Sequence, residues 1–374
     1  MEPRRNQPST EATNQANHPV CECCQGLEDH GRRIRRREFL TTASGAVIGA
    51  SVLGNVLPAG RVWAQAKEPA VFTASPESLV KVLYDTLSPM QRESICFAWD
   101  HKDEDRGLLR THVSANWDIT DRYISESDFY TKDQQAIIRQ VYEGIISPEW
   151  HKRIDKQLED DAGGYGEQNS IAIFGEPGSD KFEFVMTGRH MTIRCDGNSA
   201  DHVAFGGPIF YGHAASDFNE APTHPGNVFW PQAVAANKLY EMLDGTQQEQ
   251  ALLRKGLPRE SDVAFEGKDG KFQGLPVSEL SSDQKEHLQK VMAMLIEPYR
   301  QSDRDEVTHC LKTQGGLDAC HLAYYAQNDL GNDGVWDIWR LEGPSFVWHY
   351  RGAPHVHVWV NVADSPKVKL NVPT

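Results

Sequence analysis

The stretch that decides the fold lies near the C-terminus and reads Pro354-His355-Val356-His357-Val358-Trp359-Val360. Because β-branched valines alternate with larger polar or aromatic residues after a Gly-Ala-Pro turn, the pattern predicts a β-strand. Side chains two positions apart share a face of a strand, so His355, His357 and Trp359 are expected on one face and the valines on the other. Two imidazoles on one face, with Cα atoms roughly 6.6 Å apart, can bind one metal ion.

Three further candidate strands precede this one, and short turns separate all four. Short connections force neighbouring strands to pair antiparallel. The segment from 318 to 363 is therefore expected to form a C-terminal β-meander. Its four strands are predicted at residues 320–325, 335–341, 345–350 and 355–361.

Helical periodicity dominates the chain between residues 76 and 160. Ser75 as an N-cap, followed by a proline at the first helical position, predicts the start of the first helix. A second helix is expected to follow Pro89 and to carry Ile95, Cys96 and Trp99. We therefore expect the N-terminal half to be mostly helical.

Residues 169–300 combine both kinds of structure. Two apolar runs around a Gly-Glu-Pro-Gly turn, 170–174 and 182–194, predict a β-hairpin. Later helices are expected after Pro231 and after Ser281, and a polar linker is expected between them at 255–277. The fold class that follows is α+β, with an antiparallel β-sheet core, in a single domain over residues 67–374.

The first 66 residues differ from the rest. Arg36-Arg37-Glu38-Phe39-Leu40 matches the twin-arginine export signal, and Ala64-Gln65-Ala66 supplies a small-x-small cleavage pattern. The apolar run from 41 to 57 is too short for a committed membrane span. We expect a removable signal, export to the periplasm or cell envelope, and the twin-arginine machinery as a partner. The alternative is a basic tail followed by an anchoring helix that is never cleaved.

The net charge of the chain after residue 66 argues against some classes of binding partner. After residues 1–66 the chain keeps 30 Lys and Arg residues against 47 Asp and Glu residues, a net charge of −17. So acidic a protein is a poor candidate for binding nucleic acid or an anionic membrane surface. A small-molecule substrate or ligand is the expected partner.

Cysteines do not form a recognisable metal motif in the mature chain. Cys21, Cys23 and Cys24 cluster in the segment expected to be removed. The remaining four allow three disulfide pairings, and none of them belongs to a C-x-x-C motif. These four are Cys96, Cys195, Cys310 and Cys320.

Further histidines could complete a metal site, which needs three or four convergent ligands. His190, His213 and His224 are the natural donors, because each lies in a strand end or a glycine-rich turn. The alternative is that His355 and His357 form a solvated strand face or bond to nearby carbonyl groups.

Arginines near these motifs supply candidates for substrate binding. Arg189 or Arg340 could orient an anionic substrate, since a guanidinium fork fits a carboxylate or phosphate bidentately. Such arginines more often pair with structural acids. The chain lacks G-x-S-x-G, a Walker loop and a helical H-E-x-x-H, so the common hydrolase and nucleotide-binding motifs are missing.

Several motifs together resemble the domain-of-unknown-function family numbered 3500, over most of residues 76–363. In that family the first motif usually reads Gly-His-His and the last Asn-His-Ile-His before a tryptophan. Arg189 occupies the place of the first histidine and Pro354 that of the asparagine, so this chain looks like a divergent branch. The motifs are Gly188-Arg189-His190-Met191-Thr192, the Gly-Gly-Pro stretch ending at His213, Arg340 before Gly343-Pro344, and Pro354-His355-Val356-His357.

The resemblance brings no established reaction, so the residues carry the functional hypothesis. We expect His190, His355 and His357 to hold a divalent metal, with His213 and His224 as second-choice ligands. All-imidazole ligation suits Zn, Cu or Fe; zinc would favour hydrolysis, and copper or iron would favour oxidation. The alternatives are a periplasmic small-molecule binding protein without catalysis, in which tryptophans and arginines hold the ligand, and a structural protein of the cell envelope.

Overall fold

The computed structural model describes residues 74–370 apart from 198, 201, 216–225 and 331–334. These residues belong to one compact unit. The expected export signal, with Cys21, Cys23 and Cys24, lies outside the described residues, as does His224. No helix of the described part is long and apolar enough to cross a membrane.

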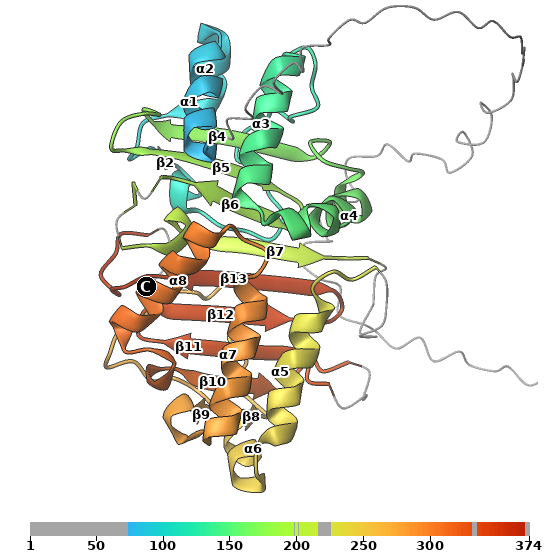
Figure 1. Ribbon diagram of the computed structural model, residues 1–374, viewed down its shortest axis with the longest axis vertical. Coiled ribbons are helices and arrows are strands. Elements are labelled where there is room, and N and C mark those ends of the chain that lie inside the picture. The colour runs from blue at the N-terminus through green and yellow to red at the C-terminus, as the bar shows by residue number, and fades with distance from the viewer. Residues whose placement is uncertain (1–73, 198, 201, 216–225, 331–334, 371–374) are drawn as a thin grey trace, which may run out of the picture. The chain divides into compact units, whose positions relative to one another are not determined.

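The unit is built on one mixed sheet of eleven strands (Figure 1). Two peripheral strands pair in parallel, β1 with β4 and β8 with β10, and the other pairings are antiparallel. The strands follow one another in space as β1 (Cys96–Phe97), β4 (Asn169–Gly175), β5 (Phe182–Gly188), β6 (Met191–Cys195), β7 (Ile209–His213), β13 (Val356–Val362), β12 (Phe346–Arg351), β11 (Ile338–Gly343), β10 (His321–Tyr325) and β8 (Leu252–Leu253), with β9 (Leu275–Pro276) also paired to β10. A separate small sheet joins β2 (Lys102–Asp103) to β3 (Gly107–Leu108).

The C-terminal meander predicted from the sequence is confirmed. Strands β10, β11, β12 and β13 pair in order and antiparallel, with His349 of β12 opposite Trp359 of β13. On its other side β13 pairs with β7, which sets His357 opposite Gly212. The strand that carries His357 and directly follows His355 therefore lies in the middle of the sheet.

The predicted run at 182–194 is not one strand. It divides into β5 and β6, which pair antiparallel with Gly188 opposite Met191. Arg189 and His190 form the turn between them, and His190 takes a φ of +57°. Left-handed backbone is uncommon outside glycine, but histidine adopts it more readily than most residues. His190 therefore points from a turn and not from a strand face.

Eight helices accompany the sheet in the described residues: α1 (Pro76–Thr86), α2 (Pro89–Ile95), α3 (Lys132–Ile145), α4 (His151–Ala162), α5 (Trp230–Met242), α6 (Gly245–Ala251), α7 (Ser282–Ile296) and α8 (Gln301–Gln314). The capping box of Ser281 and Gln284 forms as expected. One detail differs from the sequence prediction: helix α2 ends at Ile95, so Cys96 and Trp99 lie outside it.

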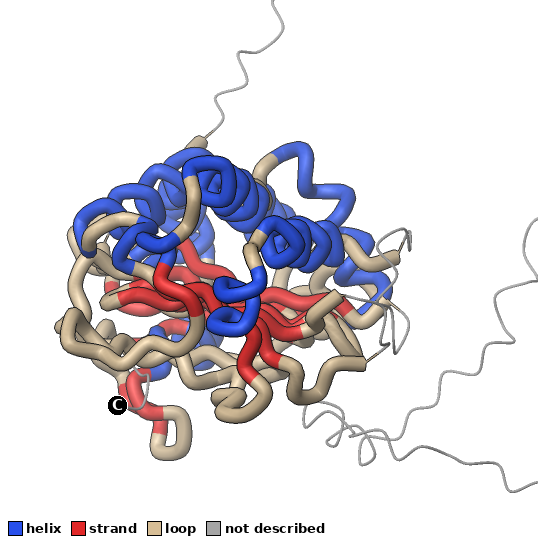
Figure 2. The backbone as a smooth tube through the Cα atoms, turned by 90° about the horizontal axis from the view of Figure 1, so that it is seen from below, coloured by secondary structure: helices blue, strands red, loops and turns tan. Residues whose placement is uncertain are grey.

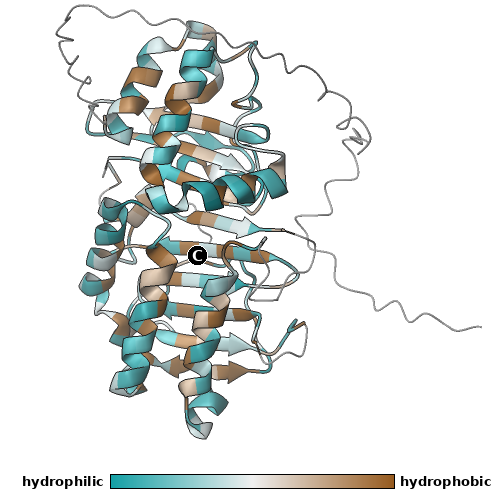
Figure 3. Ribbon diagram, turned by 45° about the vertical axis from the view of Figure 1, so that its right-hand side comes forward, coloured by the Kyte–Doolittle hydropathy of each residue, from teal (hydrophilic) through white to brown (hydrophobic). Residues whose placement is uncertain are grey.

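Most helices lie on one side of the sheet, and loops cover much of the other side (Figure 2). The helices carry both hydrophilic and hydrophobic stretches (Figure 3), as expected where one stripe of each helix covers a core. The main core gathers Val356, Val358 and Val360 of β13 with apolar residues of the helices. The four described cysteines are free, so none of the three possible disulfide pairings forms.

The opposite face of the sheet is covered in part by the segment expected to be a linker, residues 255–277. Val263 of this segment packs against Phe210, Val347 and Trp359 in a second apolar cluster. The segment is fastened by strand side chains, since Asn361 donates to the Val263 carbonyl oxygen at 2.8 Å. It is therefore an ordered cover for the sheet, which corrects the prediction of a linker.

Candidate metal centre

Strand β13 delivers two histidines to the loop-covered side of the sheet. His355 immediately precedes the strand, and His357 is its second residue. Trp359 packs on that side with Phe210, whereas Val356 and Val358 pack in the main core. The alternation predicted from the sequence is thus confirmed, and it directs both imidazoles away from the helices.

His190 reaches the same place from the β5 to β6 turn. Its backbone N–H donates to the Ala115 carbonyl oxygen at 2.9 Å, and its carbonyl oxygen accepts from the Gly212 N–H at 3.2 Å. A side chain at Gly212 would not fit, because a Cβ there would overlap the Val356 carbonyl oxygen and lie 3.4 Å from His190 Cβ. The glycine therefore makes room for the imidazole of His190 beside β13.

The three imidazoles form a compact buried cluster. His190, His355 and His357 are 1%, 4% and 1% exposed. His357 Nε2 lies 3.0 Å from His355 Nε2 and 3.1 Å from His190 Nε2. Three nitrogens around a tetrahedral zinc ion would stand roughly 3.3 Å apart, given Zn–N bonds of about 2.0 to 2.1 Å. The cluster is therefore close to the spacing of a three-histidine metal site.

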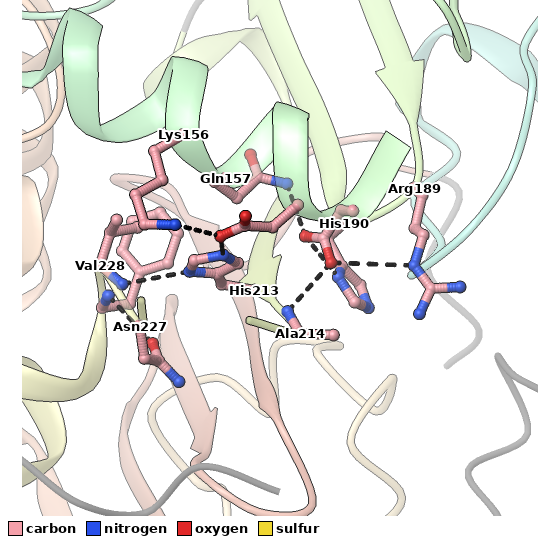
Figure 4. Close-up of polar contacts among 11 residues, drawn as sticks. Lys156, Gln157, Arg189, His190, His213, Ala214, Asn227 and Val228 are labelled. Atoms are coloured by element: carbon pink, nitrogen blue, oxygen red, sulfur yellow. Dashed lines mark hydrogen bonds and ion pairs between the residues drawn. The ribbon is translucent and has the colours of Figure 1, made fainter. Parts of the chain in front are cut away.

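A carboxylate of helix α4 holds His190 from behind (Figure 4). Asp161 Oδ2 lies 2.9 Å from His190 Nδ1, and Asp161 also accepts from Gln157 Nε2 and the Ala214 N–H. Burial would raise the pKa of Asp161, but its interactions with His190 and Gln157 outweigh burial and hold that pKa below its usual value. Asp161 is thus an ionised acceptor that places the proton of His190 on Nδ1.

A second carboxylate holds His357 in the same manner. Glu260, from the cover over the sheet, accepts from His357 Nδ1 at 2.9 Å and from Trp359 Nε1 at 3.2 Å through the same oxygen. Its other oxygen accepts from Arg351 Nη1 at 3.0 Å. Histidines that bind metal commonly donate their second N–H to a carboxylate in this way, which fixes the tautomer and the ring orientation.

These two contacts create a conflict inside the cluster. When both rings are neutral and donate from Nδ1 to the carboxylates, Nε2 of His190 and Nε2 of His357 each present a lone pair, 3.1 Å apart. Burial lowers the pKa of His190, which disfavours an extra proton as the remedy. A proton on His355 Nε2 could be donated to His357 Nε2, but the lone pair of His190 Nε2 would still face His357 Nε2. A shared metal ion relieves the conflict, because it accepts both lone pairs.

Of the two second-choice ligands, His213 does not join this cluster. His213 Nε2 contacts Asp160 Oδ2 at 3.0 Å, while its Nδ1 accepts from the Val228 N–H at 3.1 Å (Figure 4). Both nitrogens of His213 are therefore already used. His224 lies outside the described residues, so its part in the site stays a prediction.

The two candidate arginines differ in their surroundings. Arg189 lies beside the cluster, with Nε 3.8 Å from Asp161 Oδ1 and no hydrogen-bond partner for that nitrogen (Figure 4). Arg340 forms a bidentate pair with Glu342 and donates to the Asp262 carbonyl oxygen. Arg340 thus ties the cover to β11, which matches the structural alternative.

Sequence reasoning missed Asp161 and Glu260. They lie 29 and 97 residues from the histidines that they hold, one at the end of a helix and one in a polar loop. No spacing rule connects residues so far apart. The Asp160-Asp161 pair in the last turn of α4 was the one available sign, because acids are unfavourable at a helix C-terminus and need another reason to be there.

The fold and the site together define an α+β protein with a buried cluster of three histidines able to bind a metal ion. Two of these histidines, His190 and His357, each contact a carboxylate. The family model described as protein of unknown function (DUF3500) matches residues 73–362, and the chain belongs to that family. No curated protein and no solved structure matches the chain.

Proposed function

We propose that His190, His355 and His357 bind one divalent transition metal, Zn, Cu or Fe, through their Nε2 atoms. The observation that carries the proposal is the convergence of the three Nε2 atoms, with those of His190 and His357 3.1 Å apart while their Nδ1 atoms contact Asp161 and Glu260. A shared cation would accept the lone pairs of these nitrogens.

We further propose that the site is catalytic. Three protein ligands leave a tetrahedral metal one open position, as in catalytic sites, whereas structural zinc sites are usually closed by four. A zinc ion there would supply an activated hydroxide for hydrolysis, and copper or iron would supply oxidation chemistry. Asp161 and Glu260 would orient the ligands, and Arg189, whose Nε makes no hydrogen bond to a described residue, would orient an anionic substrate.

The alternative of a periplasmic binding protein without catalysis relied on tryptophans and arginines holding a ligand. Trp339, Trp348 and Trp359 are buried among apolar residues, which supports a role in the core. We therefore favour the enzyme. Export by the twin-arginine route remains part of the proposal on the strength of Arg36 and Arg37 alone, and cell fractionation of the Arg36→Lys, Arg37→Lys variant tests it.

Elemental analysis of the purified full chain tests the metal site. The expected result is close to one metal ion per chain, lost in the His355→Ala, His357→Ala variant and kept in His213→Gln, a buried histidine outside the cluster. Zinc would direct the search for activity to hydrolysis, and copper or iron to oxidation. A folded wild-type protein that takes up none of these metals, even when each is supplied, would overturn the proposal.

A further inference from the structure

A groove far from the histidine cluster combines an aromatic wall with positive charge. Its volume is about 640 Å³, and its lining includes Trp99, Arg110, Val203 and the segment from Asp364 to Leu370. This volume is within the range of small-molecule sites. Asp364 lies beyond the end of β13, and roughly 17 Å of extended strand already separate His357 from Val362. The groove is thus a separate feature from the proposed metal centre.

Arg110 is the central charged group of the groove. It is 7% exposed, its guanidinium lies 4.1 Å from the centre of the Trp99 ring, and its Nε has no hydrogen-bond partner among the described residues. Its Nη1 forms an ion pair with Glu183 at 3.3 Å. A buried cation with an unpartnered donor is costly unless another group completes its contacts.

Glu183 does not fully compensate Arg110, because a second arginine shares it. Arg194 Nη1 donates to the other oxygen of Glu183 at 2.9 Å. Burial raises the pKa of Glu183 to about 7, which weakens its negative charge at neutral pH. Asp196 adds a negative charge that acts on Arg194. Arg110 therefore keeps capacity to bind an anion.

Further cations and apolar groups surround this position. Lys367 and Lys369 are exposed and line the groove, while Val368 and Leu370 pack against Ala200 and Val203 beneath them. Asp364, the acid among the described lining residues, already contacts His202 Nδ1 at 2.6 Å. On a chain with a formal net charge of −15, this local excess of positive charge stands out as a place for an anion.

We propose that this groove binds a small organic anion, an aromatic carboxylate in the simplest form. The carboxylate would contact Arg110 and the two lysines, and the ring would lie against Trp99 and the apolar lining. The proposal is independent of the metal centre, since no residue of the groove belongs to it.

Calorimetric titration of the full chain with benzoate tests the inference, with benzyl alcohol and inorganic phosphate as comparisons. We expect benzoate to bind most tightly, and Lys367→Gln with Lys369→Gln to weaken it roughly five- to tenfold, since each exposed charged contact contributes up to about 1 kcal/mol. Lys238→Gln with Lys290→Gln, exposed lysines of α5 and α7, makes the same charge change elsewhere and should leave binding unchanged.

The His355→Ala, His357→Ala variant should bind benzoate as the wild type does, so a failure of the metal proposal would not touch this one. The inference would be overturned if benzoate failed to bind at millimolar concentration, or if the two pairs of lysine substitutions weakened it equally. Equal affinity for phosphate would also overturn it, because the apolar wall would then contribute nothing.

Discussion

His190 Nε2 and His357 Nε2 lie 3.1 Å apart although 167 residues separate them in the chain. One comes from a hairpin turn and the other from the central strand of the sheet. Each ring is fixed from behind by a carboxylate of a third and a fourth segment, Asp161 and Glu260. Four distant parts of the sequence thus specify one contact.

Loss of a supporting carboxylate is expected to weaken metal binding while keeping the ligands. Asp161→Asn and Glu260→Gln should each lower metal affinity about 10- to 100-fold, the usual effect of removing such a partner. The affinity is measured by competition with a chromophoric chelator. Asp160→Asn is the matched control, because this neighbouring acid contacts His213 and Lys156. If Asp160→Asn weakened binding as much as Asp161→Asn, the assignment of Asp161 would be wrong.

Removal of the metal is expected to lower stability. A ligand that binds only the folded state stabilises it by about 2.7 kcal/mol at a free concentration 100 times its Kd. Thermal unfolding should therefore occur several degrees lower after chelation and recover when metal is returned. The His355→Ala, His357→Ala variant should show no such response, and a response of wild-type size in that variant would place the metal elsewhere.

A methyl group at Gly212 should displace His190 and so disrupt the histidine cluster. Because the new Cβ would overlap the Val356 carbonyl oxygen and crowd His190, we expect Gly212→Ala to cost about 1 to 3 kcal/mol of unfolding free energy and to weaken metal binding. Gly245→Ala is the control, since a Cβ there meets no atom within 4 Å. Denaturant unfolding of both variants decides the matter, and equal stabilities would show that β7 can move aside.

His349 should make the protein less stable in mild acid. Burial, aided by the charges of Arg340 and Arg351, lowers the pKa of His349 to about 3, against about 6.5 in the unfolded chain. Below pH 6.5 His349 is protonated in the unfolded state but stays neutral in the folded state, so stability falls as pH falls towards 3. The free energy of unfolding of the wild type should fall by about 2 kcal/mol through His349 as the pH is lowered from 7 to 5.

The His349→Gln variant isolates that contribution from other groups. Glu183, with its pKa raised to about 7, acts in the opposite direction, because its stabilising effect is present at low pH and lost as pH rises. The variant keeps Glu183, and its free energy of unfolding should fall by about 2 kcal/mol less than that of the wild type between pH 7 and pH 5. Parallel pH profiles of the metal-free proteins would show that His349 is protonated in the fold.

Strong local patterns made the central part of this structure predictable. The alternation through β13 and the short turns before it determine the meander, and two histidines at positions 355 and 357 share a face by geometry alone. His190 was correctly placed with them as a candidate, but not the turn that presents it, because a left-handed histidine leaves no periodic signal.

Tertiary proximity decided what the sequence could not show. Glu260 belongs to a segment whose polar, glycine-broken composition predicts a linker, yet Arg340, Asn361 and Arg351 fasten that segment to the sheet. Likewise α8 is held by its surroundings, since its buried positions include Asp303 and Gln314 beside Val307 and Cys310. Such contacts exist only after the strands have assembled, so no local window contains them.

The place of β13 in the strand order also sets when the site can exist. All the other strands precede β13 in the chain, yet β13 lies between β7 and β12 and is the element through which the two halves of the sheet are hydrogen-bonded. During synthesis, β4 to β7 and β10 to β12 leave the ribosome as two groups of strands, each with an unpaired edge. A chain interrupted before His355 would keep both edges open and lack two of the three imidazoles. Completion of the sheet and creation of the histidine cluster are therefore a single late event in the life of each molecule.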